Sequence, residues 1–191
     1  MLSCNHVSGA TTPVDTTLKG WQMQGIRTAR AIVEVALLMS VLPAHALADA
    51  GKSPASPIYG VTVPEGYRKW EMIAPAEEGP PLDELRAVLG NPVAMKAIAR
   101  STLPFPDGTI LVKLAYKRKQ STEFESATVP GQATTVQVMV KDSRKYASTG
   151  GWGFGRFING QPVDRAQHET CFACHQARVK NHDYVFTRFA P

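Results

Sequence analysis

Short apolar segments separated by turn residues run along the second half of the chain. Residues 109–116 and 134–140 are rich in β-branched and aliphatic side chains, which favours two largely buried strands. Residues 84–89 predict a further strand, and in 150–157 glycine alternates with aromatic residues, as in a strand in close contact with something flat. The pattern predicts an α+β fold, mainly an antiparallel β-sheet with a few short helices.

Helical signals are few and short. Pro92 suits the first position of a helix over 93–100, residues 164–175 form a second helical segment, and Asp142 is expected to cap a short helix through Tyr146. The 15 glycines and 14 prolines argue against long uninterrupted helices.

An apolar segment near the N-terminus has the features of a secretory signal. Two arginines precede the apolar stretch 31–42, and small residues lead to Ala48. The stretch is shorter than the roughly 20 residues that span a bilayer, so a retained membrane anchor is the less favoured alternative. We expect residues 1–48 to be a leader that is cleaved after Ala48, with either Met23 as the true start or an unusually long leader.

Removal of the leader implies a periplasmic protein with no membrane span. Residues 49–66 are rich in Ala, Ser, Pro and Gly, which is typical of a flexible tether, and residues 67–191 form the expected folded domain. The full chain has 21 Lys and Arg against 16 Asp and Glu, a net charge of +5, which is too weak to indicate a nucleic-acid partner. The basic run 117–119 is interpreted as an exposed hairpin tip.

The strongest chemical signal is the sequence Cys171-Phe-Ala-Cys174-His175. The Cys-x-x-Cys-His spacing attaches haem covalently: the two thiols add to the two vinyl groups, and the histidine that follows ligates the iron. The cofactor expected from the motif is therefore one covalent haem c, with His175 as the metal ligand.

Redox, disulfide and zinc chemistry suit the motif less well. A thioredoxin-like pair needs a βαβ setting that is missing here, and a disulfide across two residues would be strained. Structural zinc needs two further ligands, for which only His168 and His182 are available. A chance match is the remaining alternative, and export favours haem because c-type maturation takes place outside the cytoplasm.

The sequence resembles the cytochrome P-460 family, which includes the β-type cytochromes c′, from Tyr67 to Pro191. The matching elements are Tyr67-Arg-Lys-Trp70, Phe105-Pro-Asp-Gly-Thr-Ile-Leu-Val-Lys113, Val140-Lys-Asp-Ser143, Gly151-Trp-Gly-Phe154, the Cys-x-x-Cys-His motif and Asp183-Tyr-Val-Phe-Thr-Arg-Phe189. The resemblance implies a mainly antiparallel β-fold with the haem on one face of the sheet, usually a homodimer. It also implies five-coordinate iron that is bound by His175 and open on its other face.

Lys113 is a second candidate for cofactor binding. In the strand pattern it shares a face with Leu111 and Ala115, and burial would lower its pKa and favour the neutral, nucleophilic amine. Its position matches the family lysine that bonds to the porphyrin edge, so the resemblance implies a cross-link. The alternative is a lysine on an edge strand whose ammonium reaches solvent.

Gln137 is the informative departure from the family. The resemblance places it where hydroxylamine-oxidising members have a carboxylate above the iron, which makes Gln137 a candidate catalytic residue on the distal side. Glutamine forms hydrogen bonds but cannot accept a proton at neutral pH. Ligand binding would then survive while oxidation is weakened; the alternative is an exposed strand glutamine.

Several weaker candidates remain. His168 is interpreted as a surface residue or a propionate partner, and His182 as a less favoured sixth ligand. The methionines assigned to the core are Met72, Met95 and Met139, and the arginines that would pair with propionates are Arg86, Arg144 and Arg188.

The sequence thus predicts a periplasmic monohaem c-type cytochrome that oxidises hydroxylamine or binds nitric oxide. An oxidising enzyme would pass electrons to a small acceptor cytochrome. The alternatives are a β-type cytochrome c′ that captures nitric oxide without turnover, and a simple electron carrier with both axial positions filled.

Overall fold

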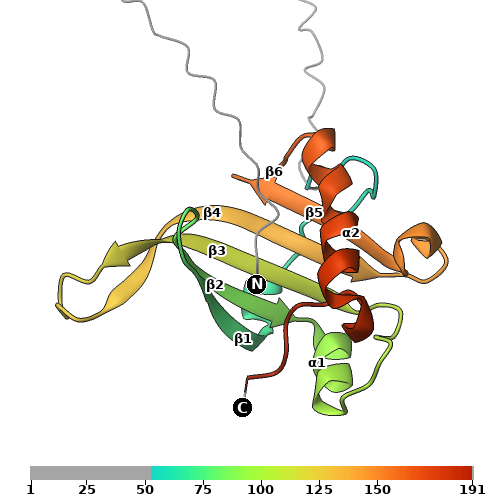
Figure 1. The fold of residues 1–191 in the computed structure, drawn as a ribbon, viewed down its shortest axis with the longest axis horizontal. Helices are drawn as coiled ribbons and strands as arrows, with labels where there is room; N and C mark the ends of the chain where they lie inside the picture. Colours follow the sequence, from blue (N-terminus) through green and yellow to red (C-terminus); the bar gives the residue numbers. More distant parts are fainter. Residues whose placement is uncertain (1–52, 191) are drawn as a thin grey trace, which may run out of the picture. The chain divides into compact units, whose positions relative to one another are not determined.

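Consecutive strands form one antiparallel sheet in which every strand pairs with its neighbours in the sequence (Figure 1). The computed structural model describes residues 53–190, and the expected leader over 1–48, with cleavage after Ala48 and a start at Met23, lies outside the described residues. The strands are β1 (Glu71–Glu78), β2 (Glu84–Gly90), β3 (Ile110–Gln120), β4 (Thr128–Lys141), β5 (Trp152–Ile158) and β6 (Gln161–Pro162).

Two α-helices and three 3-10 helices accompany the sheet in the described part of the chain. They are α1 (Pro92–Ala99), α2 (Arg165–Val179), η1 (Tyr67–Lys69), η2 (Ala147–Thr149) and η3 (Lys180–His182). The predicted α+β class with a mainly antiparallel sheet is confirmed. Between residues 53 and 190, no helix is both long enough and apolar enough to cross a membrane.

Side-chain caps explain where both α-helices begin. Asn91 accepts a hydrogen bond from the backbone N–H of Ala94 at 2.9 Å, and Pro92 occupies the first turn of α1, as predicted. Asp164 accepts from the backbone N–H of Gln167 at 2.8 Å and thereby starts α2. Helix α2 follows the last strand and lies over one face of the sheet (Figure 1).

Two local predictions were wrong. The basic run 117–119 belongs to β3, which pairs with β4 as far as Gln120 and Thr128, so the hairpin tip comes later in the chain. The segment from Asp142 to Tyr146 is a turn and not a helix. Asp142 accepts two backbone N–H groups as an N-cap does, but the chain passes through the short η2 and then reverses into β5 at Gly150 and Gly151, which have positive φ.

The described part of the predicted tether, from residue 53 to residue 66, is packed against the sheet. Tyr59 and Val61 are buried, and the Ser56 hydroxyl donates to the backbone oxygen of Phe154 at 2.9 Å. Here the small and polar residues serve close packing rather than flexibility.

The glycines of β5 do have flat neighbours, but these neighbours are side chains of the same chain. A Cβ atom added at Gly153 would lie 2.3 Å from the ring of Tyr146, and one at Gly155 would lie 2.7 Å from the ring of Phe157. Both positions therefore require glycine for close packing of aromatic rings.

Candidate functional site

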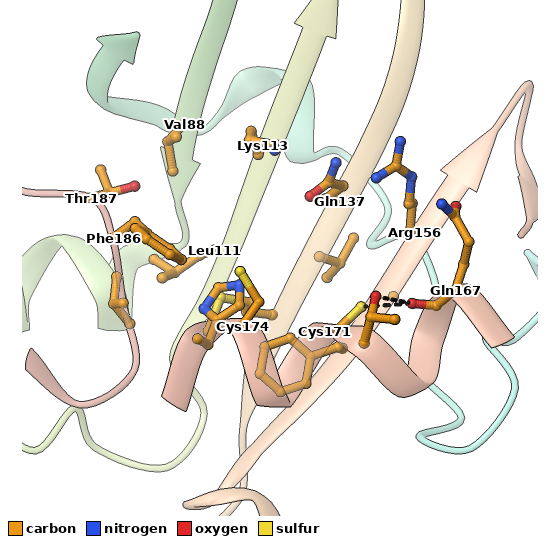
Figure 2. Close-up of a pocket in the computed structure, with 17 residues that line it drawn as sticks. Val88, Leu111, Lys113, Gln137, Arg156, Gln167, Cys171, Cys174, Phe186 and Thr187 are labelled. Carbon is orange, nitrogen blue, oxygen red and sulfur yellow. Dashed lines mark hydrogen bonds between the residues drawn. The ribbon is translucent and has the colours of Figure 1, made fainter. Parts of the chain in front are cut away.

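A pocket lies between the sheet, helix α2 and the C-terminal segment 185–187 (Figure 2). The empty space between its walls is about 860 Å³, a value that includes the open solvent at its mouth. The sheet contributes Val88, Leu111, Lys113, Gln137, Val138, Met139, Phe154, Gly155 and Arg156, and α2 contributes Gln167, Thr170, Cys171, Cys174 and His175.

Strand register brings three polar side chains of the sheet into one row. Gln137 of β4 is the partner of Lys113 on β3 and of Arg156 on β5, so their side chains share the face that lines the pocket. Figure 2 shows this row opposite the two cysteines of α2. Residues that are far apart in the sequence thus form one polar wall.

Helix α2 supplies the opposite wall. Cys171 and His175 are four residues apart and therefore lie on one face of the helix, and Cys174 also lines the pocket. Cys171 is a half-buried free thiol, and burial raises its pKa. The motif thus presents its sulfur atoms and its imidazole to one cavity.

His175 is oriented by a hydrogen bond to the main chain. Its Nδ1 lies 2.6 Å from the backbone oxygen of Tyr184, which can only accept, so Nδ1 carries the proton and Nε2 keeps its lone pair. The rings of Phe154 and Phe186 flank the imidazole at 5.0 and 4.9 Å between centroids. Burial lowers the pKa of His175, which favours the neutral form that ligates metals.

Lys113 is the amine of the polar row. Burial, reinforced by the positive charges of Arg86 and Arg156, lowers its pKa to about 7. A large part of the population is therefore neutral near neutral pH, and the amine is then a nucleophile.

Beside this row, on the same face of the sheet, Arg86 is buried with two carboxylates. It donates to Glu84 through Nε and Nη2 at 3.0 and 2.6 Å, and Nη1 contacts Glu78. Thr134 donates to the other oxygen of Glu84 at 2.6 Å. Burial lowers the pKa of Arg86 to about 10. This ion-pair group is engaged in its own contacts and does not line the pocket.

Gln137 faces the pocket rather than solvent. Its side-chain N–H donates to the hydroxyl of Thr135 at 3.2 Å, which leaves the amide oxygen for other contacts. Among the described residues that line the pocket, none is aspartate or glutamate. The described lining therefore holds no carboxylate that takes up a proton.

Several of the weaker candidates lie away from the pocket. His182 binds the backbone oxygen of Val185 and packs edge-on against Phe105, so it is not placed to ligate a metal in the cavity. Met72 is 54% exposed and is not a core residue, whereas Met95 packs against the core. Met139 packs against the core and also lines the pocket.

The arginine and His168 interpretations need correction. The predicted propionate partners, namely Arg86, Arg144 and Arg188, do not line the pocket. His168 is fully buried and not a surface residue, because both of its ring nitrogens bind main-chain groups. Among the described residues, the arginine that lines the pocket is Arg156. It follows Phe154 by two residues in β5, and residues two apart in a strand point to the same face, which is the sequence signal for this placement.

The residues present fit a covalent haem better than a metal ion alone. Within the described residues, no three His, Cys, Asp or Glu side chains are grouped to hold a metal, which removes the zinc alternative there. In that same part of the chain, the buried hydroxyl of Thr187 has no hydrogen-bond partner, although this residue lines the pocket. An unsatisfied hydroxyl, an imidazole lone pair and two sulfur atoms around one cavity suit a large group with polar substituents.

A comparison with protein families agrees with a haem-binding protein. A family model described as Cytochrome P460 matches residues 64–187, which include the whole sheet and α2. A comparison with curated proteins gives no match.

Proposed function

The chain belongs to the cytochrome P460 family, and is thus a c-type haem cytochrome; on that premise we propose that it binds nitric oxide at five-coordinate haem iron and oxidises hydroxylamine only slowly. One haem c is held through Cys171 and Cys174, with His175 as the axial ligand. A bound haem supplies an iron that changes oxidation state and holds a small nitrogen ligand.

The observation that carries this proposal is the orientation of His175. Its Nδ1–H is fixed on the Tyr184 carbonyl, so the lone pair of Nε2 is directed by the fold and not by the cofactor. Phe154 and Phe186 pack against the ring and restrict its rotation. No other histidine lines the pocket within residues 53–190, which supports a single histidine ligand.

Lys113 is the residue that we propose to bond to the porphyrin edge. The amine nitrogen would replace a hydrogen on a ring carbon, so that one N–H and one C–H bond are lost and one C–N bond forms. This change removes two electrons and two protons, and it requires a two-electron oxidant of the peroxide class. The lowered pKa of Lys113 supports the role, because only the neutral amine has a lone pair to donate.

The polar wall supports ligand binding better than proton-coupled oxidation. Gln137 donates and accepts hydrogen bonds, and the pocket residues that the structure describes include no carboxylate base. Oxidation of hydroxylamine releases protons, whereas binding of nitric oxide does not. Gln137 on the distal side would therefore leave the oxidation slow.

Met139 favours a second candidate function, a simple electron carrier. Its side chain lines the pocket, and a thioether is a common second axial ligand in electron-carrier cytochromes. Its packing against the core favours a structural role for Met139 instead.

An absorption spectrum of the reduced protein tests the proposal. A five-coordinate haem is high-spin, and the cross-link to Lys113 shifts the Soret band to longer wavelength. A low-spin spectrum that becomes high-spin in Met139→Leu would establish the electron carrier and refute the open site. Titration with nitric oxide should give stoichiometric binding in both the unchanged protein and Met139→Leu.

We place the protein in the periplasm, as a homodimer that serves a small acceptor cytochrome when it turns over. The secretory pattern of residues 1–48 supports export, and the family resemblance supports the dimer and the acceptor. Sedimentation of the mature protein tests the dimer directly.

A further inference from the structure

His168 is a fully buried histidine outside the haem-binding motif. It lies in α2, three residues before Cys171, and it is the one fully buried residue of this helix. The backbone N–H of Arg156 donates to its Nε2 at 3.1 Å, and its Nδ1 lies 2.8 Å from the backbone oxygen of Asp164.

These two contacts determine the tautomer of His168. A backbone N–H can only donate, so Nε2 must be the unprotonated nitrogen, and a carbonyl oxygen can only accept, so Nδ1 must carry the proton. The ring therefore links the cap of α2, at Asp164, to strand β5, at Arg156. It bridges two elements that form opposite walls of the pocket.

The helix has few other attachments of this kind. Its remaining residues are half-buried or exposed, and among the strands of the described chain its contacts are mainly with β5. His168 and His175 are seven residues apart, or about two turns, so both lie on the face of α2 that is turned toward the sheet. A change in the position of His168 is thus transmitted along the helix to His175.

Both histidines use Nδ1–H on a main-chain carbonyl, but their Nε2 atoms differ. The lone pair of His168 is taken by the Arg156 N–H, whereas that of His175 faces the pocket. The contact with β5 therefore also keeps His168 from competing as a ligand.

We propose that His168 is a positioning residue, which sets the placement of Cys171 and His175 over the sheet by joining α2 to the backbone of β5; the role toward haem rests on the proposed function. The hydrogen bond to Arg156 fixes the separation between the cysteine wall and the polar row. Loss of the bond lets the helix move, although the motif itself is intact.

Three variants of the full-length, haem-loaded protein test this role. In His168→Gln the amide oxygen takes the place of Nε2 and still accepts from Arg156, whereas the side chain of His168→Asn is too short to reach it. Arg165→Gln is the control, because it alters the same end of α2 at an exposed residue that pairs with Glu169 on the helix. The measurements are amide hydrogen exchange at Arg156 and the iron–histidine stretching band of the reduced protein by resonance Raman.

We expect the Arg156 amide to exchange about tenfold faster in His168→Asn than in His168→Gln, since a buried N–H then lacks its partner. The iron–histidine band should shift or broaden in the Asn variant and keep its position in the Gln variant and in Arg165→Gln. A purely structural role would lower thermal stability without moving that band.

Two outcomes would overturn the proposal: an unchanged band in His168→Asn, or an altered band in His168→Gln despite protection of the Arg156 amide. A protein without covalent haem would refute the proposed function instead. In that case the exchange at Arg156 still shows whether His168 holds the helix.

Discussion

Replacement of Gln137 by glutamate should raise the rate of hydroxylamine oxidation. The substitution keeps the length and shape of the side chain and adds a carboxylate to a pocket whose described lining contains none. The Thr135 hydroxyl, which now accepts from the Gln137 amide, can rotate and donate to the new carboxylate. The variant therefore changes proton affinity with little change in packing.

The size of the gain follows from the neighbours of Gln137. A positioned general base contributes about 10²–10⁴-fold to a rate. Arg156 on one partner strand is cationic, and Lys113 on the other is partly protonated near neutral pH until it is cross-linked. A cation close to a carboxylate lowers the carboxylate pKa by roughly 1–3 units, which weakens the base. We expect a gain of about a hundredfold, equivalent to a barrier lower by roughly 2.7 kcal/mol.

The same charge acts on Lys113. A carboxylate on the partner strand favours the protonated amine and raises the pKa of Lys113 above its present value of about 7. Cross-linking in Gln137→Glu should accordingly be slower, so each preparation needs peptide mapping to establish the state of Lys113 before rates are compared.

The assay is steady-state oxidation of hydroxylamine with an artificial electron acceptor, together with the affinity for nitric oxide. Gln167→Glu is the matched control, because it adds the same charge from the α2 wall. Affinity for nitric oxide should change far less than the oxidation rate. Equal turnover in Gln137→Glu and the unchanged protein, or an equal gain in Gln167→Glu, would refute the argument that a base at position 137 limits the reaction.

Four further predictions concern the cofactor, the leader and the fold. Acid-acetone extraction should leave the haem on the polypeptide through the two motif cysteines; free haem in the extract, or bound zinc, would contradict this. The cross-link at Lys113 should form faster as pH rises through about 7, because the neutral amine then increases, and Lys113→Ala should move the Soret band to shorter wavelength; an unmodified Lys113 peptide in full yield would exclude the bond. Intact mass of protein from the native cell envelope should show cleavage after Ala48, and retention of residues 31–48 would disprove it. Arg86→Met should lower the free energy of unfolding by about 3–5 kcal/mol in urea titrations, because it leaves Glu78 and Glu84 without their buried cation; a loss below about 1 kcal/mol would contradict the estimate.

The sheet was largely predictable from local patterns. Residues 109–116 and 134–140 are rich in apolar and β-branched side chains and lie almost entirely within β3 and β4, and residues 84–89 lie within β2. The ends of β3 and β4 were missed because the hairpin beyond Tyr116 is exposed on both faces, where hydrogen bonding between the strands, and not burial, maintains the pairing. Periodicity carries no signal in such a region.

The site was predictable in part. The Cys-x-x-Cys-His motif identifies the wall formed by α2, and the strand face of Lys113 identifies the wall formed by the sheet. Both are predictable because the spacing of a motif and the alternation of side chains along a strand are local properties of the sequence. The placement of Arg156 beside Gln137 depends on strand register, and the burial of His168 depends on the docking of α2. Both arise from pairing between distant segments, which a single sequence does not specify.

The neighbour-to-neighbour order of the strands has a consequence for biogenesis. Each pairing closes only a short or moderate loop, so the sheet can assemble quickly from one end to the other. Helix α2 comes last in this order, and its Cys171 thiol is half-buried once the helix is seated. A chain that has completed its sheet but not yet docked α2 therefore exposes both motif cysteines next to the sheet wall of the pocket. On the proposed function, this is the state to which haem would be attached.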